Sequence, residues 1–371
     1  MQGEQGMQVV GSRLVCQDTD IRVAEGYHMD DEHASYPNDV TRSEIYGDKE
    51  SSPAGSLEDI PQFRNFRSSE LEAVTNFFSN QNVIGKGDSA VVYKGVLRNG
   101  VEVAIKNFCV DALQHEHVLH YAEVFSVLQQ HENVVKFLGY CHETKIQMYQ
   151  IEGKCVAAER RHRLVVEEYM PNGSLSDIID GSSPQLDWTS AFRIIRGIAQ
   201  GVAHIHNRGA VHLDLKPMNI LLDSDMNPKI CDFERSKILN KNDEEVAERV
   251  MKDLAGTLGY LPPEYVADGI VSFKVDVFSF GILLLQTIRK SGLRQDSTDP
   301  IQRALEGQDD VDSFLCPSSH DESELKERKR CMDIGMQCAA KERTNRPTMW
   351  EVIDMLDGKE QPQSPEAPNE E

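Results

Sequence analysis

Hydrophobic and polar positions follow different periods in different parts of the chain. After a glycine-rich turn, residues 91–93 continue as a strand, Asn99-Gly100 is typical of a hairpin turn, and residues 101–106 alternate as a returning strand. Residues 120–129 and 191–207 carry apolar side chains three and four positions apart, which predicts helices. The pattern therefore predicts a small antiparallel sheet followed by a mainly helical region.

Both ends of the chain lack such a period. Residues 1–62 are polar and acidic, with thirteen Asp and Glu against four Lys and Arg in positions 1–60, and residues 358–371 are rich in Pro and acidic side chains. Such segments bury too little apolar surface to fold, so a disordered leader and a disordered tail are predicted. An ordered domain is expected over residues 63–357, with a first lobe over about 80–168 and a second over about 171–357.

Two shorter segments complete this outline. Ser68 or Ser69 can cap a helix that carries an apolar stripe from Leu71 to Phe78. Residues 142–162 are rich in His, Glu, Lys and Arg and are too numerous for a hairpin loop. They are predicted to form an exposed insertion between two strands, without a chemical role.

Four polar residues at fixed spacing carry the candidate chemistry. Asp214, Lys216 and Asn219 lie on one loop, and Asp232 follows a strand pair predicted over residues 220–231. A tight hairpin therefore holds an Asp, a Lys and an Asn beside a second Asp. Phosphoryl transfer needs a carboxylate to orient the attacking hydroxyl, a cation for the moving group, and hard oxygen ligands for magnesium.

At these residues the chain resembles the eukaryotic protein kinases, whose catalytic loop reads H-R-D-x-K-x-x-N and whose metal motif reads D-F-G. The resemblance implies that Asp214 is the base that orients the substrate hydroxyl and that Lys216 stabilises charge. It also implies that Asn219 and Asp232 are the Mg²⁺ ligands. The expected cofactors are therefore ATP and Mg²⁺.

The glycine-rich turn is interpreted as a flap over ATP phosphates. A dinucleotide-binding fold needs a helix straight after the glycines, whereas a strand follows them here. The run Val-Ala-Ile-Lys that ends at Lys106 is that of the kinase strand whose lysine pairs with the α- and β-phosphates. The resemblance implies nucleotide binding by Gly85, Gly87, Ala90, Val92, Ala104, Lys106, Glu123, Glu168, Met170 and Leu222.

Several of these assignments depend on acidic residues. Glu123 is expected to form an ion pair with Lys106, with Glu116 as the less favoured alternative. Glu167 is expected at the back of the adenine pocket, where a carboxylate must find a partner or shift its pKa. The backbone of residues 168–170 is expected to face adenine.

The resemblance extends over about residues 63–357. Residues 73–85 are similar to the lead-in of plant receptor-like kinase domains. Glu264 and Arg346 are expected to form an ion pair, and Asp276 is expected to cap the catalytic loop from a buried helix. The implied roles of these three residues are structural.

Composition limits the possible partners and location. The net charge of −22 argues against a nucleic acid or an anionic membrane surface as a partner. The eight cysteines show no CxxC pairing and are expected to be reduced thiols. No apolar run is long enough to cross a membrane, and Gln2 stands where N-myristoylation requires Gly. We expect a cytoplasmic protein, or one held at the plasma membrane by a partner.

The sequence thus predicts an α+β bilobal protein kinase fold with ATP in the cleft. Lys216 and Thr257 favour a Ser/Thr kinase, similar to receptor-like cytoplasmic kinases of plants. Its expected partners are a protein substrate and a membrane receptor complex. Because Leu213 replaces the usual Arg (a non-RD type) and Ser236 is the single hydroxyl residue in 235–256, activation is not expected to depend on a loop phosphate. The alternative is an inactive pseudokinase scaffold, favoured by Glu234 in place of the motif glycine and by Glu167, Ala90 and Leu213.

Overall fold

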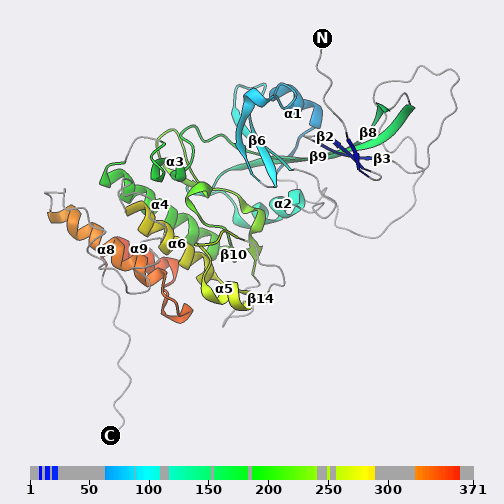
Figure 1. Ribbon diagram of the computed structural model, residues 1–371. Helices are drawn as coiled ribbons and strands as arrows, with labels where there is room; N and C mark the ends of the chain where they lie inside the picture. The colour runs from blue at the N-terminus through cyan, green and yellow to red at the C-terminus, as the bar shows by residue number, and fades with distance from the viewer. Residues whose placement is uncertain are drawn as a thin grey trace, which may run out of the picture. The chain divides into compact units, whose positions relative to one another are not determined.

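The computed structural model describes residues 8–10, 13–16, 19–23, 63–87, 89–108, 117–151, 154–182, 186–239, 249–250, 256–288 and 322–359. The chain divides into two compact units. The first is formed by Met1–Ser126 with Phe137–Tyr169, and the second by Val127–Lys136 with Met170–Glu371. Figure 1 shows that the long strands belong to the first unit and most helices to the second.

The first unit is built on a sheet to which nine described strands contribute. Seven of them follow in the order β1-β2-β3-β9-β7-β6-β5, and β8 pairs with β9 and with β4. The pairs are antiparallel, except that β4 runs parallel to β8. The strands are β1 (Gln8–Val10), β2 (Arg13–Cys16), β3 (Thr19–Val23), β4 (Arg64–Asn65), β5 (Val83–Lys86), β6 (Ala90–Val96), β7 (Glu102–Phe108), β8 (Phe137–Ile151) and β9 (Lys154–Glu168).

Three of these strands lie in the leader, where the sequence predicted no ordered element. Val10 is paired with Arg13 in the hairpin of β1 and β2, and Ile21 is paired with Arg160 where β3 joins β9. The prediction of a disordered leader weighed the composition of the whole segment, and it stays a prediction. A strand edge supplies hydrogen bonds to any extended segment beside it, and composition does not reveal that edge. The rest of the predicted leader, and the tail beyond residue 359, lie outside the described residues.

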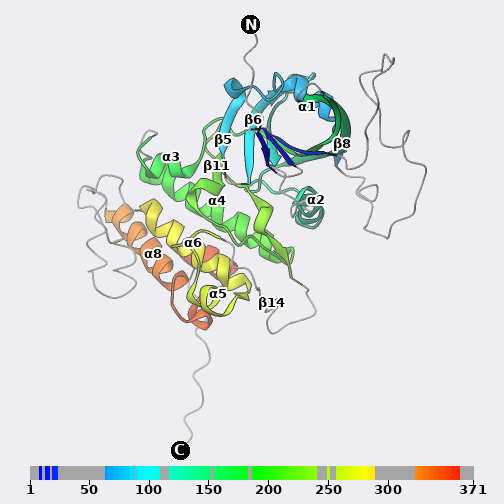
Figure 2. The same ribbon diagram turned by 45° about the vertical axis from the view of Figure 1, so that its right-hand side comes forward.

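One face of the sheet forms the apolar core of the first unit. Directly opposed residues of antiparallel neighbours share a face, so Val103 and Ile105 of β7 lie on the same side as Leu164 and Val166 of β9. Figure 2 shows the sheet curving from β5 and β6 round to β8, with helix α1 (Ser68–Val74) against it. The buried cluster comprises Phe66, Leu71, Leu97, Val103, Ile105, Cys141, Leu164 and Val166.

Helix α1 begins at a contact with a distant strand. Glu143 of β8 accepts hydrogen bonds at Oε2 from the backbone N–H of Ser68 at 3.1 Å and from its hydroxyl at 2.6 Å. Ser68 is the first helical residue, and the N-cap position is Arg67, whose side chain makes no capping bond. The predicted serine cap was therefore wrong, because a carboxylate far away in the sequence supplies the acceptor.

The segment predicted as an insertion loop is instead part of a long hairpin. Strands β8 and β9 each have 15 residues and stay paired up to Ile151 opposite Lys154. Arg163 joins the two strands, because its guanidinium donates to the backbone oxygens of Glu143 at 2.8 Å and of His162 at 3.0 Å. Burial lowers the pKa of Arg163 to about 10, so the side chain remains a cation at neutral pH.

The two remaining helical elements of the first unit are α2 (His117–Leu128) and the 3-10 turn η3 (Asn80–Asn82). Helix α2 buries Val118, Tyr121, Ala122, Phe125 and Leu128, a spacing of three and four positions that turns one face of the helix toward the protein interior. The helix was predicted over 120–129, and its observed bounds agree within three residues.

The second unit is mainly helical. Helix α6 is buried along almost its whole length, and Figure 1 shows α4, α6 and α8 side by side. Its helices are α3 (Leu175–Ile179), α4 (Trp188–Asn207), α5 (Pro263–Asp268), α6 (Phe273–Ile288), α8 (Glu322–Cys338) and α9 (Met349–Leu356), with 3-10 turns η4 (Pro217–Asn219), η5 (Phe233–Arg235) and η7 (Arg343–Asn345). Short strand pairs join β10 (Ala210–Val211) to β13 (Lys237–Ile238), β11 (Ile220–Leu222) to β12 (Pro228–Ile230), and β14 (Arg249–Val250) to β15 (Ile270–Val271).

The close pairing of β4 with β8 leaves no room for a side chain at Gly139. A Cβ atom built there would lie 2.0 Å from the backbone oxygen of Arg64, and that oxygen cannot move without shifting β4. We expect Gly139→Ala to lower the free energy of unfolding by about 2–3 kcal/mol, the usual range for overpacking a fixed contact. Urea unfolding of the full chain measures this, with Met148→Ala, an exposed change in the same strand, as a neutral control. An unchanged unfolding midpoint for Gly139→Ala would show that β4 moves aside without cost.

Candidate active site

The predicted catalytic loop lies between β10 and β11 in the second unit. The loop ends in the 3-10 turn η4, and β11 then pairs with β12, with Ile220 opposite Ile230. The backbone N–H of Cys231 donates to the backbone oxygen of Asn219 at 2.9 Å. This pairing places Asn219 and Asp232 at the same end of the two-stranded sheet, as their spacing predicted.

Asp214 lies at the centre of a network of donors. Lys216 Nζ donates to its Oδ2 at 2.9 Å, and Asn219 Nδ2 approaches the same oxygen at 3.3 Å. The hydroxyl of Thr257 donates to Oδ1 at 2.8 Å and accepts a bond from Lys216 Nζ, also at 2.8 Å. The carboxylate is 5% exposed, so these donors fix its orientation in a largely buried setting.

A second cation approaches the same carboxylate. Arg235 Nε lies 3.9 Å from Oδ2 of Asp214, and the side chain of Arg235 is 44% exposed. Together with Lys216 it places two cationic side chains beside one carboxylate. Arg235 was not among the predicted site residues.

His212 fixes the backbone on both sides of the site. Its Nδ1 accepts a hydrogen bond from the backbone N–H of Asp214 at 3.2 Å, and its Nε2 lies 2.9 Å from the backbone oxygen of Cys231. Since Nδ1 accepts, these bonds assign the ring proton to Nε2, which donates to Cys231. The ring of Phe233 packs edge-on against His212, with centroids 4.9 Å apart. One histidine therefore connects the catalytic loop to the metal motif.

Asp276 holds the backbone of the catalytic loop from inside helix α6. Its Oδ2 accepts from the backbone N–H of His212 at 2.8 Å, and its Oδ1 accepts from that of Leu213 at 2.9 Å. His206 Nε2 lies 3.0 Å from Oδ2. Burial alone would raise the pKa of Asp276, but the hydrogen bonds and nearby charge, His206 foremost, leave it below its ordinary value. These are the contacts that the predicted capping role of Asp276 requires.

Leu213 occupies a strained position in this loop. Its φ is 66°, in the left-handed region that a leucine adopts only at a cost, and its side chain is 1% exposed. The side chain packs in a cluster with residues that include Tyr265 and Val275. Leu213 therefore replaces the usual arginine with an apolar contact, and the bond from its N–H to Asp276 helps to hold the strained backbone.

The metal motif places its strain at Asp232 and not at Glu234. Asp232 has φ 66° and ψ 68°, whereas Glu234 lies inside the 3-10 turn η5. A 3-10 turn has ordinary right-handed angles that any residue adopts. The backbone therefore accommodates Glu234 without needing the freedom of glycine.

Oxygen atoms suited to a divalent cation are present at this end of the sheet. Asn219 Nδ2 donates to the backbone oxygen of Asp214 at 2.8 Å, so its amide oxygen is the atom left to face a cation. Asp232, half-buried at the start of η5, offers a carboxylate. Carboxylate and amide oxygens are the hard ligands that Mg²⁺ prefers, and Mg²⁺ commonly takes one or two protein ligands beside phosphates and water. The described residues contain no cluster of three or more His, Cys, Asp or Glu suited to a metal.

In the first unit, the predicted nucleotide-binding residues gather on the face of the sheet opposite its core. Val92 is opposite Lys106 and Gly85 is opposite Val92 in the strand register, and Ala104 is two positions from Lys106 on β7. These positions therefore share one face. The N–H of Gly87 donates to the backbone oxygen of Ala90 at 2.9 Å, which closes the glycine turn.

Helix α2 brings a tyrosine to Lys106. Lys106 Nζ donates to Tyr121 Oη at 3.3 Å, whereas the predicted partner Glu123 lies on the exposed side of the helix. Two residues along an α-helix turn the side chain by about 200°, so Tyr121 and Glu123 face opposite ways. Glu116, the alternative, lies outside the described residues.

The remaining predicted residues lie at the end of β9, directly after it in the chain, and in β11. Glu167 and Glu168 end strand β9 and are half-buried, and Glu167 is opposite Ala104 in the register. Met170 is 8% exposed, and Leu222 in β11 is fully buried. The assigned nucleotide contacts of these residues stay predictions.

The ion pair predicted between Glu264 and Arg346 is confirmed. Arg346 Nη1 and Nη2 donate to the two oxygens of Glu264 at 2.5 and 2.9 Å. The other donors reach the backbone oxygens of Ala340, Lys274 and Lys341 at 2.7–3.1 Å, so all five N–H groups are used. This fully satisfied cation, 1% exposed, joins α5 to the end of α8 and to η7.

The fold and this loop define the class of the protein. The family model of the protein kinase domain matches residues 78–356, and the chain belongs to that family. Its architecture is the bilobal protein kinase fold. Members of this family generally use ATP and Mg²⁺.

Its relatives are receptor-like kinases of plants. Cysteine-rich receptor-like protein kinase 19 of Arabidopsis thaliana is 35% identical over 318 residues, which cover 82% of this chain and 45% of that protein. Cysteine-rich receptor-like protein kinase 6 of Oryza sativa subsp. japonica is 35% identical over 298 residues, covering 77% and 40%. A G-type lectin S-receptor-like serine/threonine-protein kinase of Arabidopsis thaliana is 34% identical over 318 residues, covering 81% and 35%. The chain thus spans less than half the length of these relatives.

Two observations complete the comparison with the sequence predictions. Among the described helices none is both long and apolar enough to cross a membrane. Five of the cysteines, Cys141, Cys155, Cys231, Cys331 and Cys338, are free thiols.

Two residues of the site escaped the sequence analysis. Tyr121 shares a helical face with Phe125 and Leu128, and that spacing was the signal that would have placed it toward the sheet. Arg235 lies directly after the metal motif, and only the turn η5 brings it back toward Asp214. The sequence carries no local signal for such a return.

The buried acceptor Asp276 gives a test of the catalytic loop. Asp276→Asn keeps the shape but loses charge and acceptors, so we expect it to lower the free energy of unfolding by about 3 kcal/mol near neutral pH. Because the folded-state pKa lies below the ordinary value, the stabilisation is present above the ordinary carboxyl range and is lost as pH falls through the folded pKa. The stability difference between wild type and Asp276→Asn should therefore shrink below about pH 4.

Urea unfolding at several pH values measures that difference. Asp333→Asn, which changes an exposed aspartate of α8, is the matched control and should leave stability unchanged. A difference for Asp276→Asn that stayed constant down to acid pH would show that its charge has no part in holding the loop.

Proposed function

We propose that this chain is a Ser/Thr protein kinase that transfers the γ-phosphate of ATP to protein hydroxyls. The observation that carries the proposal is the orientation of Asp214 by Lys216, Asn219 and Thr257. A buried carboxylate held by three donors beside a lysine is suited to orient a hydroxyl and to balance a moving phosphoryl group. The relatives, named as receptor-like kinases, support a role in plant receptor-type signalling.

In this mechanism Asp214 accepts the substrate hydroxyl. Its Oδ1 takes one hydrogen bond from the described residues, that of Thr257, and a carboxylate oxygen has capacity for a second. The hydroxyl oxygen attacks the γ-phosphorus, the bond to the β-phosphate oxygen breaks, and the hydroxyl proton passes to Asp214. Lys216, already bound to Asp214 and Thr257, stabilises the charge of the transferred group.

The nucleotide contacts are assigned to both units. In the first, Gly85, Ala90, Val92 and Ala104 share the sheet face of Lys106, and Gly87 lies in the turn between β5 and β6. Lys106 is proposed to bind the α- and β-phosphates. In the second, Asn219 and Asp232 are proposed to hold Mg²⁺. Bound magnesium would neutralise phosphate charge and fix the phosphate geometry.

The partners and location remain proposals of the same kind. The substrate is proposed to be a protein, presented in the cytoplasm or at the plasma membrane through a receptor complex. The chain's negative charge of −22 disfavours direct binding to an anionic lipid surface, so a protein partner would supply the attachment.

Phosphate transfer by the full chain tests the proposal. We expect Mg²⁺-dependent autophosphorylation or transfer to a generic protein substrate, lowered about 10²–10⁴-fold by Asp214→Asn and abolished by Lys106→Met. Asp232→Asn is the control for metal dependence. Radiolabelled ATP gives the readout, and circular dichroism confirms that each variant is folded.

Two outcomes would separate the kinase from the scaffold. Silence of the wild type together with activity in Glu234→Gly would show that Glu234 switches the enzyme off. Silence of both would leave the pseudokinase scaffold as the function. The ordinary backbone of Glu234 in η5 favours an active wild type.

Ser236 provides a test of control by loop phosphorylation. It is fully buried, and its hydroxyl donates to the backbone oxygen of His212 at 3.3 Å. Ser236→Ala loses one long hydrogen bond, so activity should stay within about threefold of wild type. Ser236→Asp buries a carboxylate and should destabilise the chain by about 3 kcal/mol or more. A strong loss of activity in Ser236→Ala that Ser236→Asp restores would contradict this account.

A further inference from the structure

Arg235 is an exposed cation beside the proposed base. Its Nε lies 3.9 Å from Oδ2 of Asp214, and its side chain is 44% exposed, whereas that of Asp214 is 5% exposed. We propose that Arg235 is a specificity-determining residue that selects acceptor segments with an anionic side chain, a carboxylate or a phosphate, one or two positions from the acceptor hydroxyl. This inference rests on the proposed kinase function and adds the class of substrate to it.

The turn η5 fixes the backbone that carries Arg235. Phe233 and Ser236 lie on either side of it in the turn, and both are fully buried. The ring of Phe233 packs edge-on against that of His212, with centroids 4.9 Å apart, and the hydroxyl of Ser236 donates to the backbone oxygen of His212 at 3.3 Å. The backbone N–H of Ser236 donates to the backbone oxygen of Phe233 at 3.2 Å and closes the turn. The backbone at Arg235 is therefore anchored to the catalytic loop, while its side chain stays at the surface.

The two cations beside Asp214 are engaged to different degrees. Lys216 Nζ donates to Asp214 at 2.9 Å and to the hydroxyl of Thr257 at 2.8 Å, and the side chain of Lys216 is 18% exposed. The distance of 3.9 Å from Arg235 to Asp214 is longer than a hydrogen bond. Asp214 therefore consumes none of the five N–H donors of Arg235. A planar guanidinium can hold a carboxylate or a phosphate through two parallel hydrogen bonds.

The spacing of a polypeptide brings such an anion within reach. Consecutive residues of an extended segment are about 3.3–3.8 Å apart. When the acceptor hydroxyl is bound to Asp214, a side chain one or two positions away can therefore meet the guanidinium of Arg235, which begins 3.9 Å from that carboxylate.

The charge of the whole chain does not oppose this contact at short range. The net charge of −22 repels an anionic segment at long range. Salt screens this repulsion beyond about 8 Å at physiological ionic strength. Arg235 acts inside that distance, so its charge decides between anionic, neutral and cationic neighbours of the acceptor.

The first test compares four peptides as substrates of the full chain. They share one sequence with a single acceptor serine and carry Asp, phosphoserine, Ala or Lys at the position beside it. We expect kcat/KM of the wild type for the Asp peptide to be about three- to tenfold that for the Ala peptide, and this ratio to fall to about one in Arg235→Ala. Because the ratio is taken within each variant, a general loss of activity cancels.

The phosphoserine peptide identifies the source of the anion. A kcat/KM above that of the Asp peptide indicates a substrate that is already phosphorylated beside the acceptor. A value equal to or below that of the Asp peptide indicates a carboxylate.

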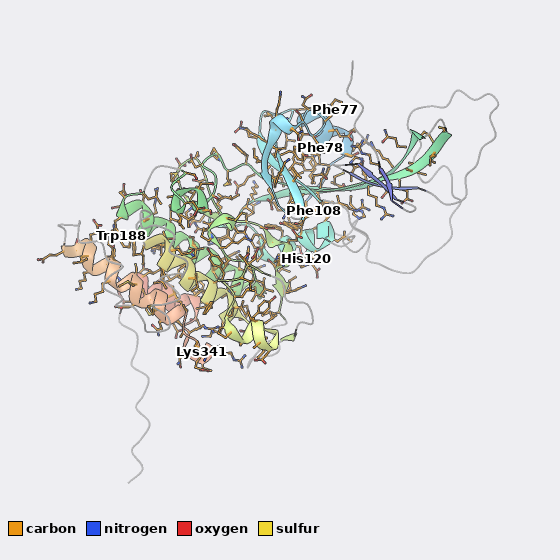
Figure 3. The ribbon with its side chains drawn as sticks, in the orientation of Figure 1. Phe77, Phe78, Phe108, His120, Trp188 and Lys341 are labelled. Atoms are coloured by element: carbon orange, nitrogen blue, oxygen red, sulfur yellow. The ribbon has the colours of Figure 1, made fainter. Side chains whose placement is uncertain are left out.

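Lys341→Ala is the matched control. Figure 3 labels Lys341, an exposed cation of the same unit that follows α8 in the chain. Its replacement removes one positive charge, as Arg235→Ala does. A preference that came from net charge alone would fall in both variants, whereas we expect Lys341→Ala to keep the ratio of the wild type.

A second measurement follows peptide binding and needs no phosphate transfer. Fluorescence anisotropy of labelled peptides gives each Kd without nucleotide, and the wild type should bind the Asp peptide about three- to tenfold more tightly than the Lys peptide. Arg235→Lys should retain part of this preference, because an ammonium keeps the charge but lacks the planar fork. Arg235→Glu should reverse it, because like charges repel. A residue that only supports the turn would not reverse the preference.

The outcomes separate this inference from the kinase proposal. If the wild type transfers no phosphate but prefers the Asp peptide in binding, and Arg235→Glu reverses that preference, the kinase proposal fails and the role of Arg235 in selecting anions stands. If the wild type shows no preference in either measurement, or if Arg235→Ala keeps the preference of the wild type, the inference is overturned.

Discussion

The catalytic loop depends on one buried carboxylate. Asp276 is fully enclosed in α6, and it accepts the backbone N–H groups of two consecutive loop residues, His212 and Leu213. These bonds compensate for the left-handed backbone of Leu213, which would otherwise relax. The next residue is Asp214. Asp276 therefore helps to orient the proposed base, although it has no proposed contact with the substrate. If the loop moved away, the buried carboxylate of Asp276 would lose its donors at a large cost in free energy. The packing of α6 and the conformation of the loop are therefore coupled.

The two positions that depart most from the family pattern are accommodated in different ways. Leu213 exchanges a docking cation for packing in an apolar cluster, so the loop gains stability where related kinases gain a phosphate sensor. Glu234 sits in a 3-10 turn, and the strain of the motif falls on Asp232 alone. Neither substitution disturbs the contacts of Lys216, Asn219 and Asp214. The proposed chemistry of the loop therefore does not require the usual arginine at position 213 or the usual glycine at position 234.

Spacing along the chain was enough to predict the loop but not the contacts made across space. Asp214, Lys216 and Asn219 meet because they lie within one short loop, and a motif read from sequence contains that geometry. The contact of Tyr121 depends on the rotational phase of α2, which turns each successive side chain by about 100°, and spacing from Lys106 alone, which pointed to Glu123, does not determine that phase. The pairing of β3 with β9 depends on an edge that composition does not describe. The contact of Glu143 with the start of α1 could not be predicted for the same reason, because the acceptor and the helix are far apart in the sequence.

The 3-10 turn η5 has a pharmacological consequence. Phe233 is fully buried, packs against His212, and is followed by a residue that lacks the torsional range of glycine. A small molecule that binds by ejecting this phenylalanine must unwind η5, break the His212 contact and expose an aromatic ring to water. Compounds that occupied the proposed nucleotide site without moving Phe233 would meet none of these penalties. The burial of Phe233 and its contact with His212 therefore favour the second type of inhibitor.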